Sequence, residues 1–303
     1  MSDVLVEVDG QRMKLSNLDK VLYPESGFTK AEVIDYYTRV APVLLPHLRN
    51  RAATRKRYPD GVDAEPFFEK NAPSHTPAWV RTEELPTPGS TLGRDTANFV
   101  VIDDLPTLVW CANLAALELH IPQWQITPDG GRGDADLMVF DLDPGPPATV
   151  VECSQVALWL RDALADDGLE AHPKTSGRKG MQLYVPVRET PADRTSAYAK
   201  RLAEKLERAH PDLVVSRMAK KLRGGKVFID WSQNNAAKTT VAPYSLRAAP
   251  EPTVSTPLTW DEVEECTGPA DLRFTSADVL ARVDADGDLF TPLLAAKRGS
   301  LDA

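Results

Sequence analysis

The sequence has little of what marks a secreted or membrane protein. It contains no apolar run of about 18 residues, which a membrane-spanning helix needs. Its N-terminus, Met-Ser-Asp-Val, shows no basic segment followed by an apolar one, so we expect no secretory signal. The three cysteines, Cys111, Cys153 and Cys266, are odd in number and far apart, which excludes a disulfide framework and a four-cysteine zinc site. We therefore expect a cytoplasmic protein.

Internal repeats and low-complexity segments are also absent, and no Pro- or Ser-rich linker divides the chain. The 303 residues, 42% hydrophobic and 26% charged, have the composition of a globular protein. The predicted strands and helices alternate irregularly, which favours an α+β (mixed α/β) protein over a regular doubly wound one. We expect a single domain over residues 1–303.

A net charge of −9 argues against a polyanionic partner, but the charge is unevenly distributed. Residues 251–303 carry eleven acidic and four basic side chains, a net charge of −7. Residues 172–248 carry sixteen basic and six acidic side chains, a net charge of +10. This asymmetry indicates either a polyanion bound by the basic part or an ordinary solvated surface.

Local patterns predict two helices, a strand and a long loop. A capping box at Thr29 begins a helix that runs towards His47, although two prolines weaken its second half. The apolar spacing of residues 105–119 predicts another helix, and residues 121–126 follow as a strand. Residues 71–93 are rich in Pro, Thr, Ser and Gly, which predicts a long loop.

Three aspartates on two predicted strands form the strongest candidate site. Asp141 and Asp143 lie in Val139-Phe-Asp-Leu-Asp-Pro-Gly145, so a strand turns both to one face and ends directly after them. Asp230 is a lone acid in the apolar strand Val227-Phe-Ile-Asp-Trp231, and a buried charge needs a partner or a cation. Together they suit two divalent cations for phosphoryl transfer. The Asp-x-Asp pair alone fits a surface turn or a glycosyltransferase that uses nucleotide sugars equally well.

Basic, glycine-containing and aromatic segments supply further candidates. Lys174-Thr-Ser-Gly-Arg-Lys-Gly180 is either a cradle for a triphosphate or a polar hairpin turn. Residues 217–226 hold five basic side chains and no acid, so they form either a phosphate-contacting loop or a solvated charge run. Phe67 and Phe68 either stack on bases or, as is commoner for such a pair, pack in a core. His120 is either a phosphate or metal contact or a structural residue.

Eight of the chain's short motifs occur in a recognisable order: Asn17-Leu-Asp-Lys-Val-Leu-Tyr-Pro24, Ala53-Thr-Arg-Lys-Arg57, Phe67-Phe-Glu-Lys70, Val139-Phe-Asp-Leu-Asp-Pro-Gly145, Lys174-Thr-Ser-Gly177, Val227-Phe-Ile-Asp-Trp231, Lys238-Thr-Thr240 and Ala242-Pro-Tyr-Ser-Leu-Arg247. With these motifs the chain resembles the polymerase domain of bacterial ligase D, a member of the archaeo-eukaryotic primase superfamily, from about residue 15 to residue 289. The resemblance implies a primase-like catalytic core of two mixed β-sheets flanked by helices, with the active site between the sheets.

The resemblance also implies a role for each matching residue. The acids that would hold two Mn²⁺ or Mg²⁺ ions and act in catalysis are Asp141, Asp143 and Asp230. The residues that match the family's nucleotide-binding set are His120, Ser176, Lys179, Gln182, Lys238 and Arg247. The residues that match its pocket for a DNA 5′-phosphate are Asn17, Lys20 and Lys30. The residues that match its other DNA contacts are Arg57, Phe67, Phe68, Lys70, Lys220, Arg223 and Lys226.

The implied activity is template-directed addition of NTPs or dNTPs to DNA 3′ ends at gaps or double-strand breaks, in non-homologous end joining. The implied partners are DNA that carries a 5′-phosphate, the nucleotide, the DNA-end protein Ku and a separate ATP-dependent DNA ligase. These partners place the protein at the nucleoid. The sequence has no Lys-x-Asp-Gly ligase motif, so we expect a stand-alone polymerase module.

One residue departs from the family pattern. Gln182 stands where the family usually has the histidine of Gly-Leu-His-Leu-Tyr, and a glutamine donates hydrogen bonds but cannot become cationic. The departure bears on nucleotide affinity and supports an alternative hypothesis, a non-catalytic DNA-end-binding scaffold of the same fold. The three aspartates argue against that alternative.

Overall fold

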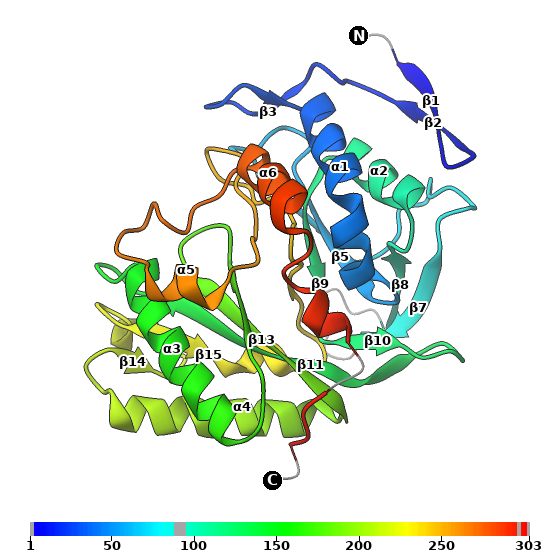
Figure 1. Ribbon diagram of the computed structural model, residues 1–303. Helices are drawn as coiled ribbons and strands as arrows, with labels where there is room; N and C mark the ends of the chain where they lie inside the picture. The colour runs from blue at the N-terminus through cyan, green and yellow to red at the C-terminus, as the bar shows by residue number, and fades with distance from the viewer. Residues whose placement is uncertain (1–2, 88–94, 296–297, 302–303) are drawn as a thin grey trace.

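A computed structural model describes residues 3–87, 95–295 and 298–301 (Figure 1). The chain begins with two small antiparallel hairpins before its first helix. These pair β1 (Val4–Val8) with β2 (Gln11–Leu15) and β3 (Val21–Tyr23) with β4 (Phe28–Thr29). The first hairpin turns at Asp9 and Gly10, both at positive φ, as a tight two-residue hairpin turn requires.

The first sheet has the strand order β16-β9-β5-β8-β7, with β6 also paired to β5, and its described pairs are antiparallel. Its strands are β5 (Ala52–Arg57), β6 (Phe67–Glu69), β7 (Thr82–Pro86), β8 (Thr96–Val101), β9 (Ala116–Ile121) and β16 (Thr240–Val241). Helices α1 (Lys30–Leu48) and α2 (Leu105–Asn113) share a buried apolar core with this sheet, and α6 (Ser276–Asp286) packs on α1.

The second sheet has the order β12-β13-β11-β15-β14, with β10 also paired to β11. Its strands are β10 (Trp124–Ile126), β11 (Arg132–Pro144), β12 (His172–Thr175), β13 (Met181–Thr190), β14 (Val214–Val215) and β15 (Val227–Asp230). The β14–β15 pair is parallel, which makes this sheet mixed. Helices α3 (Val150–Asp166) and α4 (Ala192–Ala209) pack against β11, and the short α5 (Trp260–Glu264) packs on α3 (Figure 1).

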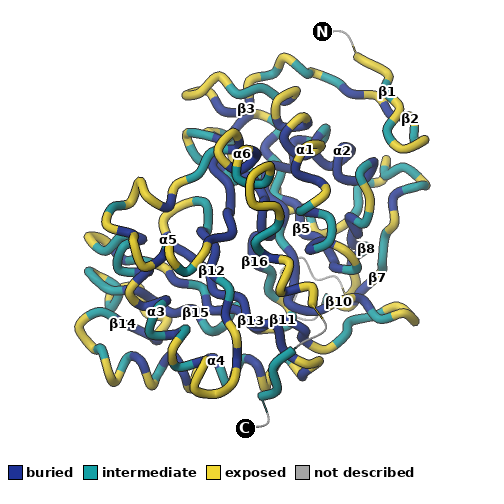
Figure 2. Tube along the Cα trace, in the orientation of Figure 1, coloured by how far each residue is buried: buried dark blue, intermediate teal, exposed yellow. Residues whose placement is uncertain are grey.

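Alternation along β11 separates an apolar face from a polar one. Met138, Phe140 and Leu142 are buried in the core that α3 and α4 cover. Because successive side chains of a strand point to opposite faces, Asp141 and Asp143 turn away from these helices. The strands of this sheet are mostly buried, whereas the outer sides of α3 and α4 are exposed (Figure 2).

The same alternation on β9 turns Glu118 and His120 away from the core under α1 and α2. Leu117 and Leu119 belong to that core. Arg178, in the loop that joins β12 to β13, reaches Glu118 with its guanidinium. The polar faces of the two sheets therefore meet, and the predicted two-sheet arrangement flanked by helices is confirmed.

Two predictions in the middle of the chain are wrong. The helix predicted over residues 105–119 ends at Asn113, and β9 follows it after a turn with Ala115 at φ +56°. Residues 117–121, Leu-Glu-Leu-His-Ile, alternate apolar and polar as a strand does, but the helical spacing of residues 105–119 extends over most of them. The strand predicted over residues 121–126 is divided between β9 and β10, which belong to different sheets.

The remaining local predictions mostly hold. The capping box at Thr29 is present, and α1 continues through Pro42 and Pro46 to Leu48 because its apolar face is buried against α2 and the first sheet. The loop predicted over residues 71–93 contains the edge strand β7, and its residues 88–93 lie outside the described part of the chain.

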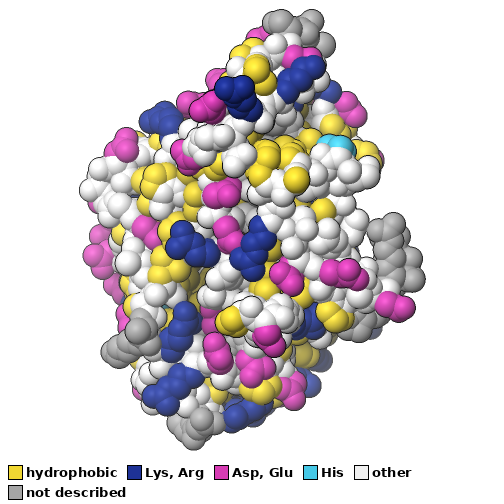
Figure 3. Space-filling view, turned by 90° about the vertical axis from the view of Figure 1, so that its right-hand side faces the viewer, with side chains coloured by type: hydrophobic (Ala, Val, Ile, Leu, Met, Phe, Trp, Pro, Cys, Tyr) yellow, Lys and Arg dark blue, Asp and Glu magenta, His cyan; other side chains and the backbone are white. Residues whose placement is uncertain are grey.

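Charges of both signs are mixed on one face of the molecule. On the face drawn in Figure 3, Lys and Arg side chains are interspersed with Asp and Glu side chains. Within the described ranges, no helix combines the length and the apolar character needed to cross a membrane.

Candidate active site

The acidic centre lies where β11 and β15 end side by side. The antiparallel register places Asp141 directly opposite Asp230, and Asp143 projects from the same face of β11 as Asp141. Gly145, two residues beyond Asp143, donates its backbone N–H to the Lys226 carbonyl over 2.8 Å. Asp230 is therefore a neighbour of Asp141 and Asp143 on one sheet, although at least 87 residues separate it from them in the sequence.

Burial and mutual repulsion dominate the electrostatics of this centre. Burial, together with the charge of Asp143, raises the pKa of Asp141 to about 7. Burial and the charge of Asp230 raise the pKa of Asp143. A divalent cation with oxygen ligands would relieve this repulsion, so the residues present fit Mg²⁺ or Mn²⁺.

The Asp230 carboxylate is engaged by its own turn. Its Oδ1 accepts from the backbone N–H of Ser232 over 3.0 Å, and its Oδ2 accepts from Nε2 of Gln233 over 2.8 Å. Among the described residues, no three His, Cys, Asp or Glu side chains are already gathered in a cage for a metal ion. Joint cation binding by the three aspartates therefore stays a prediction.

A pocket of about 600 Å³ opens beside Asp141 and Asp143. Four of the predicted nucleotide ligands line it: Ser176, Lys179, Gln182 and Arg247. The turn over residues 176–180 is pressed against its surroundings, because a Cβ on Gly177 would lie 2.5 Å from Cγ of Arg247 and Gly177 has φ +71°. Glycine is therefore required for the close approach of this turn to Arg247.

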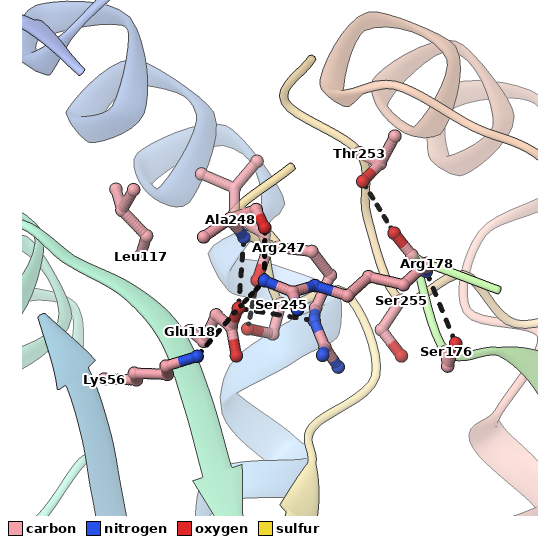
Figure 4. Close-up of polar contacts among 12 residues, drawn as sticks. Lys56, Leu117, Glu118, Ser176, Arg178, Ser245, Arg247, Ala248, Thr253 and Ser255 are labelled. Atoms are coloured by element: carbon pink, nitrogen blue, oxygen red, sulfur yellow. Dashed lines mark hydrogen bonds and ion pairs between the residues drawn. The ribbon is translucent and has the colours of Figure 1, made fainter. Parts of the chain in front are cut away.

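Three cationic side chains surround one buried carboxylate, that of Glu118, next to this pocket (Figure 4). Glu118, which is 1% exposed, accepts from the backbone N–H of Ala248 over 3.1 Å and lies 3.6 Å from Nε of Arg247. Nη2 of Arg178 lies 3.4 Å from the same carboxylate and also donates to the Ala248 carbonyl. Lys56 lies 4.0 Å away. The geometry holds several positive charges close together around one negative charge, which suits a polyphosphate above them.

The pKa of Glu118 reflects this surplus of cations. Burial alone would raise it, but the hydrogen bond with His120 and the charges of Arg247 and Lys56 bring it below its ordinary value. His120 Nε2 lies 3.0 Å from Glu118 Oε2, so the structure directs this histidine towards Glu118. Lys238, the remaining predicted nucleotide ligand, donates to Ser232 Oγ behind Asp230.

Gln182 is bonded to the acidic centre. Its Nε2 donates to Asp141 Oδ1 over 3.0 Å, and its Oε1 accepts from Nζ of Lys174 over 2.6 Å. The side chains of Gln182 and Lys174 are both buried. The amide of Gln182, a predicted nucleotide ligand, is thus directed at Asp141.

The predicted 5′-phosphate residues are brought together at the start of α1. Lys30 donates its backbone N–H to the carbonyl of Lys20, and Lys20 donates its own to the carbonyl of Asn17. Burial, followed by the charge of Lys20, lowers the pKa of Lys30 to about 8. The Lys30 ammonium donates to the Ser16 carbonyl over 2.6 Å and the Lys20 ammonium pairs with Asp60 over 2.9 Å, so binding of a 5′-phosphate here stays a prediction.

The predicted aromatic contacts are exposed rather than packed in a core. Phe67 and Phe68 on β6 are 60% and 65% exposed, and Nζ of Lys56 lies 5.1 Å from the centre of the Phe68 ring. The expectation that such a pair packs in a core is therefore wrong here. Arg57 on the neighbouring strand is held by Glu69 over 2.9 Å, and Lys70 is exposed.

The predicted basic loop approaches the acids at one point. Nη1 of Arg223 lies 4.0 Å from Asp143, and its guanidinium stacks 3.6 Å from the centre of the Phe228 ring. Lys220 is exposed, and Lys226 donates to the carbonyl of Pro211. Arg223 is thus the basic side chain of this loop that the structure places at the acidic centre.

Comparison with known proteins identifies the family of this chain. Residues 29–290 match the model of the primase-polymerase domain of LigD. The chain belongs to the LigD primase-polymerase family. Its fold is also that of a solved member, the polymerase domain of Mycobacterium tuberculosis ligase D in complex with DNA, with a TM-score of 0.88 and 45% identity over 94% of this chain and 99% of that one.

Full-length relatives of this primase-polymerase chain are named as end-joining proteins. It is 47% identical over 285 residues to the multifunctional non-homologous end joining protein LigD of Mycolicibacterium smegmatis, which covers 93% of this chain and 36% of that protein. It is 34% identical over 278 residues to the bifunctional LigD of Bacillus subtilis, which covers 91% of this chain and 43% of that protein. The chain thus spans little more than a third of the length of its mycobacterial relative.

The sequence does not single out Glu118 or Lys174 of this primase-polymerase chain as site residues. Glu118 carries the same signal as Asp230, a lone acid in an apolar run, but the run was assigned to a helix. Lys174 and Arg178 both lie in the predicted Ser-Gly segment, and only the structure reveals that they contact Gln182 and Glu118.

Proposed function

We propose that this chain is a DNA-directed nucleotidyltransferase that adds NTPs or dNTPs to DNA 3′ ends at gaps or double-strand breaks in non-homologous end joining. The observation that carries the proposal is the pairing of Asp141 with Asp230 beside a pocket lined by Ser176, Lys179 and Arg247. Carboxylates for cations and cations for phosphates in one pocket fit phosphoryl transfer to a nucleic-acid end. A glycosyltransferase would not explain Asp230 opposite Asp141.

Asp141, Asp143 and Asp230 would hold two divalent ions, Mn²⁺ or Mg²⁺. When bound, these ions would supply a Lewis acid that activates the 3′-hydroxyl and neutralises the triphosphate. The chain's own contribution is positional. Arg247, held by Glu118, and the donors of the turn over residues 176–180 bind and orient the triphosphate. Because these donors are held before the nucleotide binds, little reorganisation is needed during the reaction.

The DNA would lie across the exposed basic and aromatic surface. Phe67 and Phe68 present ring faces on which bases stack without sequence preference. Asn17, Lys20 and Lys30 would bind the downstream 5′-phosphate, and Arg57, Lys70, Lys220 and Lys226 would contact the backbone, with Arg223 next to the metal site. Ku and a separate ATP-dependent ligase are the partners that an end-joining role would require, at the nucleoid.

We expect the full chain to extend a primer across a short gap that carries a downstream 5′-phosphate, with Mn²⁺ or Mg²⁺ present. Each NTP and each dNTP is tested separately on this DNA, and product length is resolved on a denaturing gel. Template-directed products with either nucleotide class support the polymerase. Binding of the gapped DNA without extension by any nucleotide would instead identify the non-catalytic scaffold.

Substituting Lys20 should remove the preference for a 5′-phosphate. A lost charged hydrogen bond of about 1.5–3 kcal/mol corresponds to roughly 10- to 100-fold in affinity. We therefore expect the parent to bind phosphorylated gaps at least tenfold more tightly than 5′-hydroxyl gaps, and Lys20→Ala to bind both alike. Lys14→Ala, at an exposed lysine on β2 paired with Asp3, is the matched control. Equal affinity of the parent for both DNAs, measured by fluorescence anisotropy, would refute the assignment.

A further inference from the structure

Four polar residues form one row across four strands of the second sheet. Lys174 on β12 lies opposite Gln182 on β13, Gln182 lies opposite Asp141 on β11, and Asp141 lies opposite Asp230 on β15. Residues directly opposite each other on neighbouring strands project from the same face. The row therefore connects a fully buried lysine at one end to the acidic centre at the other.

Hydrogen bonds fix the direction of each member of this row. Nζ of Lys174 donates to Oε1 of Gln182 over 2.6 Å and to Oγ of Ser255. Ser255 donates its own hydroxyl hydrogen to the Thr175 carbonyl over 2.8 Å, so it accepts from Lys174. With Oε1 occupied by Lys174, the Gln182 amide presents its hydrogens to Asp141 over 3.0 Å.

Stability alone does not explain why a lysine, and not an apolar residue, is buried at position 174. Its side chain is 0% exposed, and a buried polar side chain costs folding free energy that an apolar residue of similar length would avoid. The lysine packs 5.4 Å from the centre of the Tyr184 ring, and a methionine would fill the same space. Its two hydrogen bonds therefore point to a role in holding Gln182.

We propose that Lys174 is a positioning residue, which fixes the amide of Gln182 and through it the orientation of the Asp141 carboxylate at the pocket. Lys174 does not line the pocket, although its charge and that of Asp141 interact through the protein interior. Its hydrogen-bonded connection to the Asp141 carboxylate runs through one glutamine. The inference rests on the proposed function, because it assigns to Asp141 the task of holding a divalent cation. Partners that orient a ligating carboxylate typically change metal affinity or activity by roughly 10- to 100-fold when they are lost.

Lys174→Met in the full chain tests the proposal. The Mn²⁺ dissociation constant is measured by the electron paramagnetic resonance signal of free Mn²⁺, with no DNA or nucleotide present. We expect Mn²⁺ binding to weaken by roughly 10- to 100-fold. We also expect kcat for primer extension to fall while KM for the nucleotide is unchanged, because Arg247 and the turn over residues 176–180 are left in place.

A double-mutant cycle separates positioning from general loss of stability. Gln182→Leu should weaken Mn²⁺ binding as much as Lys174→Met does, and the double variant should be no weaker than either, because both act on one carboxylate. Thr256→Val is the matched control, since its buried hydroxyl lies next to Ser255 but donates to the carbonyl of Val254. It should leave Mn²⁺ affinity unchanged.

Parental Mn²⁺ affinity in Lys174→Met would overturn the proposal, and so would additive losses in the double variant. If Lys174→Met does not fold, Gln182→Leu decides, and parental affinity in that variant overturns it equally. A parent that binds no Mn²⁺ and adds no nucleotide would overturn the proposed function as well. A parent that binds Mn²⁺ and extends primers, with variants that match it, would overturn the positioning role alone.

Discussion

Replacing Asp141 with alanine should reduce primer extension by about 10³-fold or more while DNA binding stays near the parental level. A metal-ion clamp on a transferring phosphoryl group contributes several kcal/mol to transition-state stabilisation, and each 1.4 kcal/mol is tenfold in rate. Asp141 belongs to the acidic centre, opposite Asp230 and on the same face as Asp143. Its loss therefore removes the carboxylate that both proposed metal ions would share. The DNA contacts proposed here lie on other elements, which is why binding should persist.

The matched control is Asp134→Ala, because Asp134 lies on the same strand β11 but is exposed. Its extension rate should equal that of the parent. Single-turnover extension on a gapped template measures the chemical step, and anisotropy measures DNA binding. Parental extension by Asp141→Ala would remove the mechanism proposed for this site.

Stability distinguishes a chemical defect from an unfolded variant. The pKa of Asp141 is raised to about 7 by burial and by Asp143, so without metal its ionised form costs stability in the folded chain. The cost is absent below the unfolded pKa of the carboxyl, near 4, and is complete above about pH 7. Asp141→Asn still accepts a hydrogen bond from Gln182 and removes that cost. Its metal-free melting temperature should exceed that of the parent at about pH 8, and the gain should shrink as the pH falls towards 4.

The strands that carry the acidic centre could be predicted from the sequence, but the register in which they pair could not. Alternation places Asp141 and Asp143 on one face, and the turn at Pro144 ends the strand after them. That Asp230 stands opposite Asp141, and not two residues away, depends on how β15 pairs with β11, and no local pattern encodes that pairing. The side-chain turn of Asp230 towards Ser232 is likewise set by the short helix that follows it.

The Glu118 centre could not be predicted because its strand was assigned to a helix. Residues 117–121 alternate apolar and polar as a strand does, but the helical spacing of residues 105–119 extends over most of them and hides that signal. Once β9 is known, alternation alone predicts that Glu118 and His120 leave the core together. The exposure of Phe67 and Phe68 was also beyond local patterns, since two adjacent aromatics on an edge strand are apolar in either environment.

A buried ion pair lies where the two sheets join, and removing one of its partners should be strongly destabilising. Arg51, directly before β5, donates from Nη1 and Nη2 to the two oxygens of Asp136 on β11, over 2.8 and 2.7 Å. Both side chains are buried, and Gln125 also donates to Asp136 over 3.0 Å. The pair connects the first sheet to the strand that carries Asp141.

Asp136→Ala should destabilise the chain by about 3–5 kcal/mol, because it leaves the Arg51 guanidinium buried without a counter-ion. The free energy of unfolding is measured by urea denaturation of the metal-free protein. Asp35→Ala is the matched control, since Asp35 pairs with Arg39 on the exposed side of α1 and should cost less than about 1 kcal/mol. The double variant Arg51→Met/Asp136→Leu should recover most of the loss, since two apolar side chains replace the pair and the other cation near Asp136, Arg298 at 3.7 Å, is partly exposed. A cost for Asp136→Ala no greater than that for Asp35→Ala would show that the sheets are held together without this pair.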